Sequence, residues 1–183
     1  AVVGAMREFE FLYDMWTKGK ELPLIKSYNE VTKQFEYKKM TYAWQKHNKN
    51  LVKVKVGKKT IDCTPNHKFL TTKGYIEAQN LTSNDILMGM DNSSLEYMTY
   101  NISSVSDVYN HDDGDVYDIE VEDNHNFMVS NADDNFVPIV HNCHHCPSRV
   151  FSKALMKVNP KYTLGLSATP NRLDGLTKVI KWY

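Results

Sequence analysis

The chain has 183 residues, enough for one well-cored domain and a short appendage, and its 22 Lys and Arg balance its 22 Asp and Glu. No apolar run approaches the roughly 18 residues needed to span a bilayer, and the first residues lack the basic start of a signal peptide, so we expect no membrane partner. The three cysteines are an odd number without a disulfide framework, which suits a reducing compartment. We expect a monomer in the cytoplasm, or a viral or phage protein made in the cytoplasm of its host.

The net charge of zero is the sum of two segments of opposite charge. Residues 143–183 carry seven Lys and Arg against a single acid, Asp174, and so have a net charge of +6. Residues 1–142 therefore carry −6. This asymmetry suggests two origins, although charge runs are often only solvated faces and do not fix a boundary.

The first predicted element is a short helix over residues 8–18. Phe9, Leu12, Tyr13 and Trp16 fall at the i, i+3, i+4, i+7 spacing of one helical face, and Gly19 follows as a C-cap. Such an aromatic stripe is far more often core packing than a ligand site.

The rest of residues 1–142 is predicted to be mainly β. Residues 52–56, VKVKV, alternate apolar and basic side chains, as in a strand with one buried face. Further short strands are expected at 24–25, 68–70, 85–88, 116–121, 127–129 and 136–140. Turns are expected at 57–59, 72–74, 112–114 and 131–135. Residues 90–113 are polar and weakly periodic, which predicts a surface excursion.

The pattern changes after Cys143. Apolar residues between Val150 and Val158 trace one face of a helix that must end before Pro160. A buried strand is expected at 162–166, and then a turn at 167–170. This order is typical of a fragment of an α/β domain.

The strongest chemical signal is the run His141-Asn142-Cys143. An Asn side chain can attack its own backbone carbonyl and cleave the chain as a succinimide, while a neighbouring His protonates the departing amine or polarises the carbonyl. A thiol just after the break is a nucleophile that forms thioesters. The tripeptide alone is a weak signal.

Three blocks in order make the signal specific. Thr64-Pro65-Asn66-His67 has the form TxxH, His125-Asn126-Phe127 closes a block that contains Asp118, and residues 135–142 read NFVPIVHN. Together they resemble the internal blocks of inteins in the Hint (hedgehog/intein) family. The resemblance implies a horseshoe-like all-β fold for residues 1–142 and autocatalytic protein splicing that needs no metal or cofactor. Its partners would be its own flanking exteins. No endonuclease motif fits between Leu87 and Asp115, so the resemblance is to a mini-intein.

The family resemblance also implies roles for single residues. His67 would donate to the amide nitrogen of the upstream scissile bond, with Thr64 helping to hold that amide. Asp118 would orient or deprotonate Cys143, which captures the upstream chain. His125 and His141 would assist the cyclisation of Asn142.

Position 1 departs from the family, because Ala1 stands where inteins usually have Cys or Ser. We favour an engineered Cys→Ala or Ser→Ala change that traps the precursor, because the downstream segment is still attached. The alternative is an Ala-first intein, in which Cys143 attacks the upstream bond directly. Gly4-Ala5-Met6 also replaces the usual Gly-Asp-Thr, so the first block matches least well.

Residues 143–183 resemble superfamily 2 helicases of the DEAH-like, XPB/UvsW-type group. Cys143-His144-His145 would be the tail of the acidic motif and Ser167-Ala168-Thr169 the next motif. The segment would then be part of the C-extein of a helicase that binds ATP, magnesium and nucleic acid. It has no GxxxxGK[ST] loop and cannot hydrolyse ATP alone. A zinc site at Cys143–Cys146 is disfavoured, because adjacent ligands cannot easily wrap one tetrahedral ion.

Two other classes of function stay open. The chain could be a nucleic-acid-binding helicase fragment with a β insertion, although the missing phosphate loop argues against it. It could also be a hedgehog-like autoprocessing domain, but Asn142 and Cys143 are not needed in such a domain.

Overall fold

The computed structural model describes residues 8–47, 50–110, 115–129 and 135–142. The chain divides into two compact units, Ala1–Cys143 and His144–Tyr183, and all described residues belong to the first. The elements that we expect beyond Cys143, the turn at 112–114 and most of the turn at 131–135 lie outside the described residues. The assignment of the two segments to an intein and its host stays a prediction.

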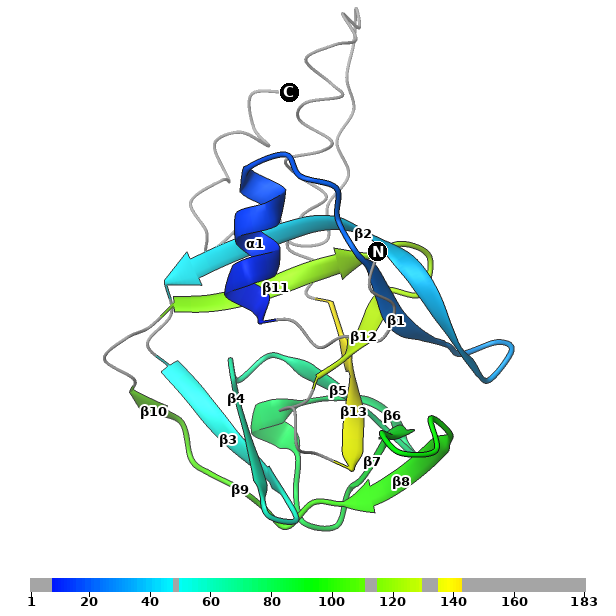
Figure 1. Cartoon of the computed structure of the whole chain (residues 1–183). Coiled ribbons are helices and arrows are strands. Elements are labelled where there is room, and N and C mark those ends of the chain that lie inside the picture. Colours follow the sequence, from blue (N-terminus) through cyan, green and yellow to red (C-terminus); the bar gives the residue numbers. More distant parts are fainter. Residues whose placement is uncertain (1–7, 48–49, 111–114, 130–134, 143–183) are drawn as a thin grey trace, which may run out of the picture. The chain divides into compact units, whose positions relative to one another are not determined.

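Helix α1 (Phe9–Thr17) forms where the spacing predicts it and is the only α-helix among the described residues. It lies across β2 and β11 (Figure 1). The Trp16 ring contacts that of Tyr42 with centroids 4.3 Å apart, and Phe9 meets Phe127 edge-on at 5.6 Å, so the aromatic stripe is core packing as predicted. Gly19 follows with a φ of 63°, in the left-handed conformation that commonly ends helices.

A first sheet has the order β1-β2-β11, from strands β1 (Leu24–Asn29), β2 (Gln34–His47) and β11 (Asp115–Val121). Strand β2 is 14 residues long and serves two antiparallel partners in turn. Its first part pairs with β1 and its second part with β11. No strand is predicted here from the sequence, because apolar and polar side chains do not alternate cleanly. In the structure only Met40 and Ala43 of β2 are buried.

A second sheet has the order β10-β3-β4, and β9 also pairs with β3. Its strands are β3 (Asn50–Val56), β4 (Lys59–Cys63), β9 (Ser104–Val105) and β10 (Tyr109–Asn110). The VKVKV prediction is confirmed, because the three valines are buried and the two lysines exposed. Gly57, with a φ of 62°, starts the turn from β3 to β4.

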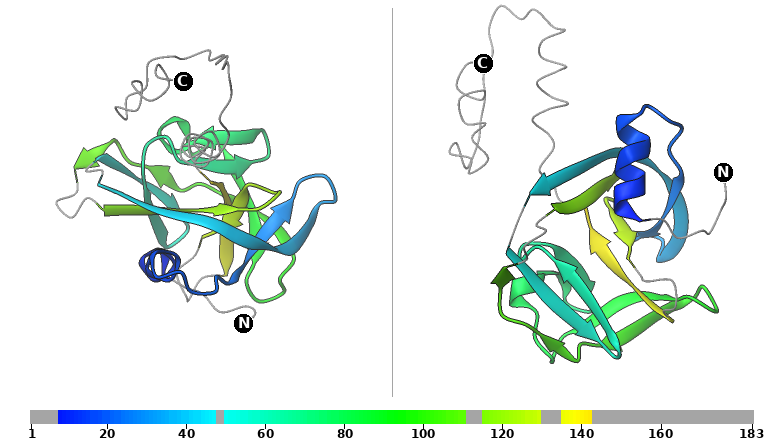
Figure 2. Two further views of the ribbon diagram at one scale, coloured as in Figure 1. Left: turned by 90° about the horizontal axis from the view of Figure 1, so that it is seen from above. Right: turned by 60° about the vertical axis from the view of Figure 1, so that its left-hand side comes forward.

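A third sheet has the order β12-β13-β5-β7-β8, and β6 pairs with β5. Its strands are β12 (Asn126–Met128), β13 (Phe136–His141), β5 (Lys68–Thr71), β6 (Gly74–Glu77), β7 (Ile86–Asp91) and β8 (Tyr97–Asn101). A 3₁₀ turn, η1 (Ala78–Asn80), follows β6. Strand β13, yellow in Figure 2, pairs with β12 on one side and with β5 and β7 on the other, and it is buried over its first five residues.

The predicted surface excursion at 90–113 is only partly right. β8, β9 and β10 lie in it and pair with β7 or β3, and Ile102 is 3% exposed. Most side chains of β8 are nevertheless exposed, which explains why the sequence shows polarity without a period.

Side chains from all three sheets and α1 share one apolar core. Phe69, Leu87, Ile119 and Phe127 are among its fully buried members. The expectation of a mainly β fold with one short helix is confirmed. No helix among the described residues is both long and apolar enough to cross a membrane.

Candidate functional site

Six of the eight predicted site residues belong to the described part of the chain, and Ala1 and Cys143 do not. The six come from four places in the fold: the turn after β4 (Thr64, His67), strand β11 (Asp118), the turn before β12 (His125) and the end of β13 (His141, Asn142).

Asn142 directly follows β13 and is only 2% exposed. Its backbone N–H donates to the His125 carbonyl at 3.0 Å, which extends the β12–β13 ladder by one bond. Its side-chain Oδ1 is buried and has no hydrogen-bond partner within the described ranges.

His141 Nδ1 lies 2.6 Å from the backbone carbonyl oxygen of Asn142. A carbonyl oxygen can only accept, so Nδ1 carries the proton in this contact. That carbonyl belongs to the peptide bond between Asn142 and Cys143. A donor at this position polarises the carbonyl and makes its carbon more electrophilic.

Tyr75 packs against the His141 ring. Its ring meets the His141 imidazole edge to face, with centroids 4.8 Å apart and planes at 83°. The Tyr75 hydroxyl donates to Glu30 Oε1 at 3.0 Å, and burial raises the pKa of Tyr75 far above its usual value. Tyr75 cannot be predicted as a site residue from the sequence, because no local pattern marks it.

His67 closes a tight turn that its neighbours dictate. The His67 N–H donates to the Thr64 carbonyl at 3.0 Å, and Pro65 takes the second position, where a fixed φ favours the turn. The turn is held against η1, since Ala78 N–H donates to the His67 carbonyl at 2.7 Å. Thr64 and His67 are thus brought together as the sequence predicts.

The environment of His67 keeps it uncharged. Burial and, to a smaller extent, a positive charge on His141 together lower the pKa of His67 to about 4. Its ring also meets Phe69 edge to face, with centroids 5.8 Å apart. At neutral pH the His67 imidazole is therefore neutral and can accept a proton or donate one.

His125 has an exposed side chain and a φ of 53°, in the left-handed region that non-glycine residues seldom adopt. Its contact with Asn142 runs through its backbone carbonyl. Asp118 is 7% exposed in β11, opposite Trp44, and its Oδ1 accepts from the Ile119 N–H at 2.8 Å.

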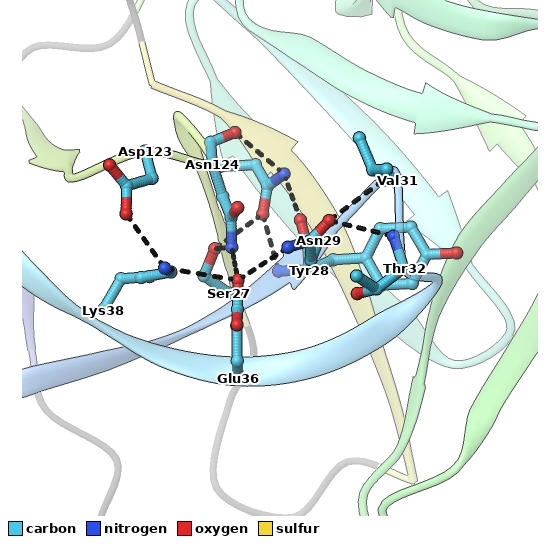
Figure 3. A network of polar contacts seen from close by, with 10 residues as sticks. Ser27, Tyr28, Asn29, Val31, Thr32, Glu36, Lys38, Asp123 and Asn124 are labelled. Carbon is cyan, nitrogen blue, oxygen red and sulfur yellow. Dashed lines mark hydrogen bonds and ion pairs between the residues drawn. The ribbon is translucent and has the colours of Figure 1, made fainter.

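A polar network that runs from the buried Ser27 to the exposed Asp123 lies beside the site, and no role for it is predicted from the sequence. It joins the β1–β2 hairpin to the turn between β11 and β12 through Ser27, Glu36, Lys38, Asp123 and Asn124 (Figure 3). Asn126 is fully buried and bonds to Ser27 and Tyr28. The sequence does contain one signal for this network: Asn126 is a polar residue between a turn and an apolar strand, and a buried amide needs hydrogen-bond partners.

The described residues contain no group of three or more His, Cys, Asp or Glu side chains that could hold a metal ion. The run from Cys143 to Cys146 lies outside the described ranges.

Residues 8–142 match the family model described as "Intein splicing domain". A DnaX mini-intein from Spirulina platensis is 30% identical, with a TM-score of 0.50, and the match covers 63% of this chain and 80% of that one. A DnaB intein from Synechocystis sp. is 24% identical, with a TM-score of 0.57 and coverages of 77% and 89%. An intein-like domain from Clostridium thermocellum is also 24% identical, with a TM-score of 0.55 and coverages of 65% and 80%.

A second sequence match covers only a short stretch. Over 45 residues, which are 25% of this chain, the chain is 44% identical to an Acanthamoeba polyphaga mimivirus protein whose name describes a putative ATP-dependent RNA helicase. The chain spans only 9% of the length of that protein.

Proposed function

Because the chain belongs to the intein splicing domain family, we propose how its residues divide the steps of autocatalytic protein splicing. Splicing is a single-turnover reaction in which the domain cleaves itself out and the flanking segments are joined. The excised part would be residues 1–142, and residues 143–183 would be the start of the downstream host protein.

The downstream cleavage is assigned to Asn142 and His141. Asn142 Nδ2 attacks its own carbonyl carbon, loses a proton and forms the succinimide, while the bond to the Cys143 nitrogen breaks and that nitrogen gains a proton. His141 donates from Nδ1 to the carbonyl oxygen as negative charge develops there. The observation that carries this assignment is the 2.6 Å contact between Nδ1 and that oxygen.

The upstream step is assigned to His67 and Thr64. A neutral imidazole can take the proton of an attacking thiol, and a conjugate acid with a pKa of about 4 readily passes it to a departing amide nitrogen. Thr64 would hold that amide from the same turn. Asp118, buried in β11, would orient or deprotonate Cys143, and His125 would assist the cyclisation of Asn142.

Ala1 leaves two routes. An engineered replacement of Cys or Ser would block the first acyl transfer and trap the precursor. In an Ala-first intein, the Cys143 thiol would attack the upstream bond itself. We favour the engineered block.

The host is proposed to be a superfamily 2 helicase that binds ATP, magnesium and nucleic acid as a whole protein. The short match to the mimivirus protein supports this, as do the Cys-His-His and Ser-Ala-Thr runs and the +6 charge of residues 143–183. The same observations favour a second candidate function, nucleic-acid binding by residues 143–183. Binding whose affinity falls steeply with salt would support that function.

Intact mass spectrometry tests the assignment on the chain carrying a short upstream tag. We expect the Ala1 chain to release residues 143–183 slowly and the Ala1→Cys chain to yield a ligated product of tag and downstream segment. Ligation by the Ala1 chain would establish the direct route through Cys143. Asn142→Ala should abolish downstream release in both chains, and equal release from that variant would contradict the mechanism.

A further inference from the structure

The Asn126 side chain makes hydrogen bonds through both of its polar atoms. Oδ1 accepts from the Tyr28 N–H at 2.8 Å and from the Ser27 hydroxyl at 3.2 Å. Nδ2 donates to the Tyr28 carbonyl at 2.8 Å and to the Asn124 carbonyl at 3.1 Å. The amide is fully buried, so these bonds form without competition from water.

These bonds replace a missing strand pairing. Tyr28 belongs to β1 in the first sheet and Asn126 to β12 in the third, and no ladder joins the two strands. The amide pairs with both backbone groups of Tyr28, as a neighbouring strand would do. Asn126 therefore fixes β12 against a strand 98 residues earlier in the chain.

The backbone of β12 holds the end of β13. Asn126 is the register partner of His141, and the carbonyl of the preceding residue, His125, accepts from the Asn142 N–H. A shift of β12 would move His141 and Asn142 with it.

The turn before β12 is held on the same hairpin. Asn124 Nδ2 donates to Ser27 Oγ at 2.8 Å and to Glu36 Oε1 at 2.9 Å (Figure 3). His125 lies between the anchored Asn124 and Asn126, which supports its left-handed backbone and aims its carbonyl at Asn142.

We infer that Asn126 is a positioning residue for the cleavage after Asn142, because its side chain fixes the strand that sets the backbone of His141 and Asn142. The inference rests on the cleavage role proposed for Asn142. It adds that this downstream step, and not the upstream acyl transfer, depends on the Asn126 amide.

The test compares both cleavages in the full chain carrying Asn126→Asp, which keeps the two acceptor contacts and loses the two donor contacts. We expect downstream cleavage to slow by about 10- to 100-fold, because small misplacements of reacting groups have effects of that size. With Ala1→Cys added, thiol-induced upstream cleavage should stay within about twofold of the parent.

A second measurement follows the backbone at position 142 instead of the cleavage rate. In an Asn142→Ala background, which blocks the reaction, amide exchange at position 142 should be faster with Asn126→Asp than without it. Asp85→Asn is the matched control, because Asp85 is also buried and bonded, but to Lys73 and Thr82. This control should lower stability without changing the ratio of the two cleavage rates.

Parental downstream cleavage in Asn126→Asp, or equal slowing of both cleavages, would overturn the inference. If that variant does not fold, Ser27→Ala removes one contact to Asn126 Oδ1 and one acceptor of Asn124 Nδ2, and should slow downstream cleavage alone by about threefold. An unchanged ratio there would also overturn it. A parent that never cleaves after Asn142 would refute the proposed function itself, whereas a reactive parent with unaffected variants would refute only the role of Asn126.

Discussion

His141 and His67, assigned to the two ends of the reaction, are held in opposite ways. His141 ends a strand and meets the carbonyl of its own neighbour at 2.6 Å. His67 lies in a turn pinned to η1, and burial sets its pKa. The downstream site is thus defined by atom positions and the upstream site by electrostatic environment. Changes in geometry should therefore damage the first, and changes in charge or pH the second.

The largest effect is expected from His141→Phe, which keeps a ring against Tyr75 and removes the donor to the Asn142 carbonyl. Downstream cleavage should slow by about 10³-fold, or about 4 kcal/mol, as is typical for a lost acid–base group. Mass spectrometry over time measures this. NMR titration of the same variant should show a higher pKa for His67, because a nearby positive charge has gone. An unchanged cleavage rate would contradict the assignment.

The lowered pKa of His67 should make the free energy of unfolding depend on pH. Its pKa is lowered from 6.5 to about 4 in the folded chain, so the unfolded chain binds more protons between these values. His67 does not reduce the free energy of unfolding above about pH 6.5. That free energy falls by about 3 kcal/mol as the pH drops from 6.5 through about 4, because the unfolded chain takes up the proton first. Urea unfolding between pH 7 and 4 should show a smaller loss in His67→Gln than in the parent. His47→Gln, at an exposed position, should follow the parent.

Gly89→Ala tests the packing of β7 against β13. An added Cβ would collide with the Val137 carbonyl and the Phe136 ring of β13. We expect a loss of about 2 kcal/mol in the free energy of unfolding and slower downstream cleavage, because overpacking shifts the backbone. Gly19→Ala is the control: nothing lies within 4 Å, and only its left-handed φ costs about 1 kcal/mol. Denaturant unfolding that ranks Gly19→Ala as the more harmful change would argue against this packing.

The smallest effect is expected from Tyr75→Phe. The ring stays against His141, while the hydroxyl loses its bond to Glu30 and its contact with the Asn126 side chain, so stability should fall by about 1 kcal/mol. Downstream cleavage should change by less than about threefold. Tyr75→Leu, which removes the aromatic edge, should be slower in the same assay. Equal rates for both variants would mean that the ring does not orient His141.

Much of this molecule can be predicted from local patterns. The helical spacing of Phe9 to Trp16 and the alternation of residues 52–56 each report burial over a few residues, and both elements form as expected. Pro65 and the histidine two positions later likewise make their turn with bonds inside the block.

The rest depends on contacts between distant residues. β2 is missed because its stability comes from ladders with β1 and β11 instead of from a buried face. Asn126 and Tyr75 are missed because their partners lie 98 and 45 residues away in the chain. A short motif names the reacting groups, but the residues that aim them are set by tertiary structure.

The place of β13 in its sheet has a consequence during synthesis. It comes last among the described strands, yet β12, β5 and β7 all pair with it. A growing chain can fold its early hairpins, but it cannot complete this sheet until residues 136–141 have left the ribosome. Long-range pairing of this kind is slow. The site around Asn142 should therefore form only after the bond that it cleaves, between Asn142 and Cys143, has been synthesised.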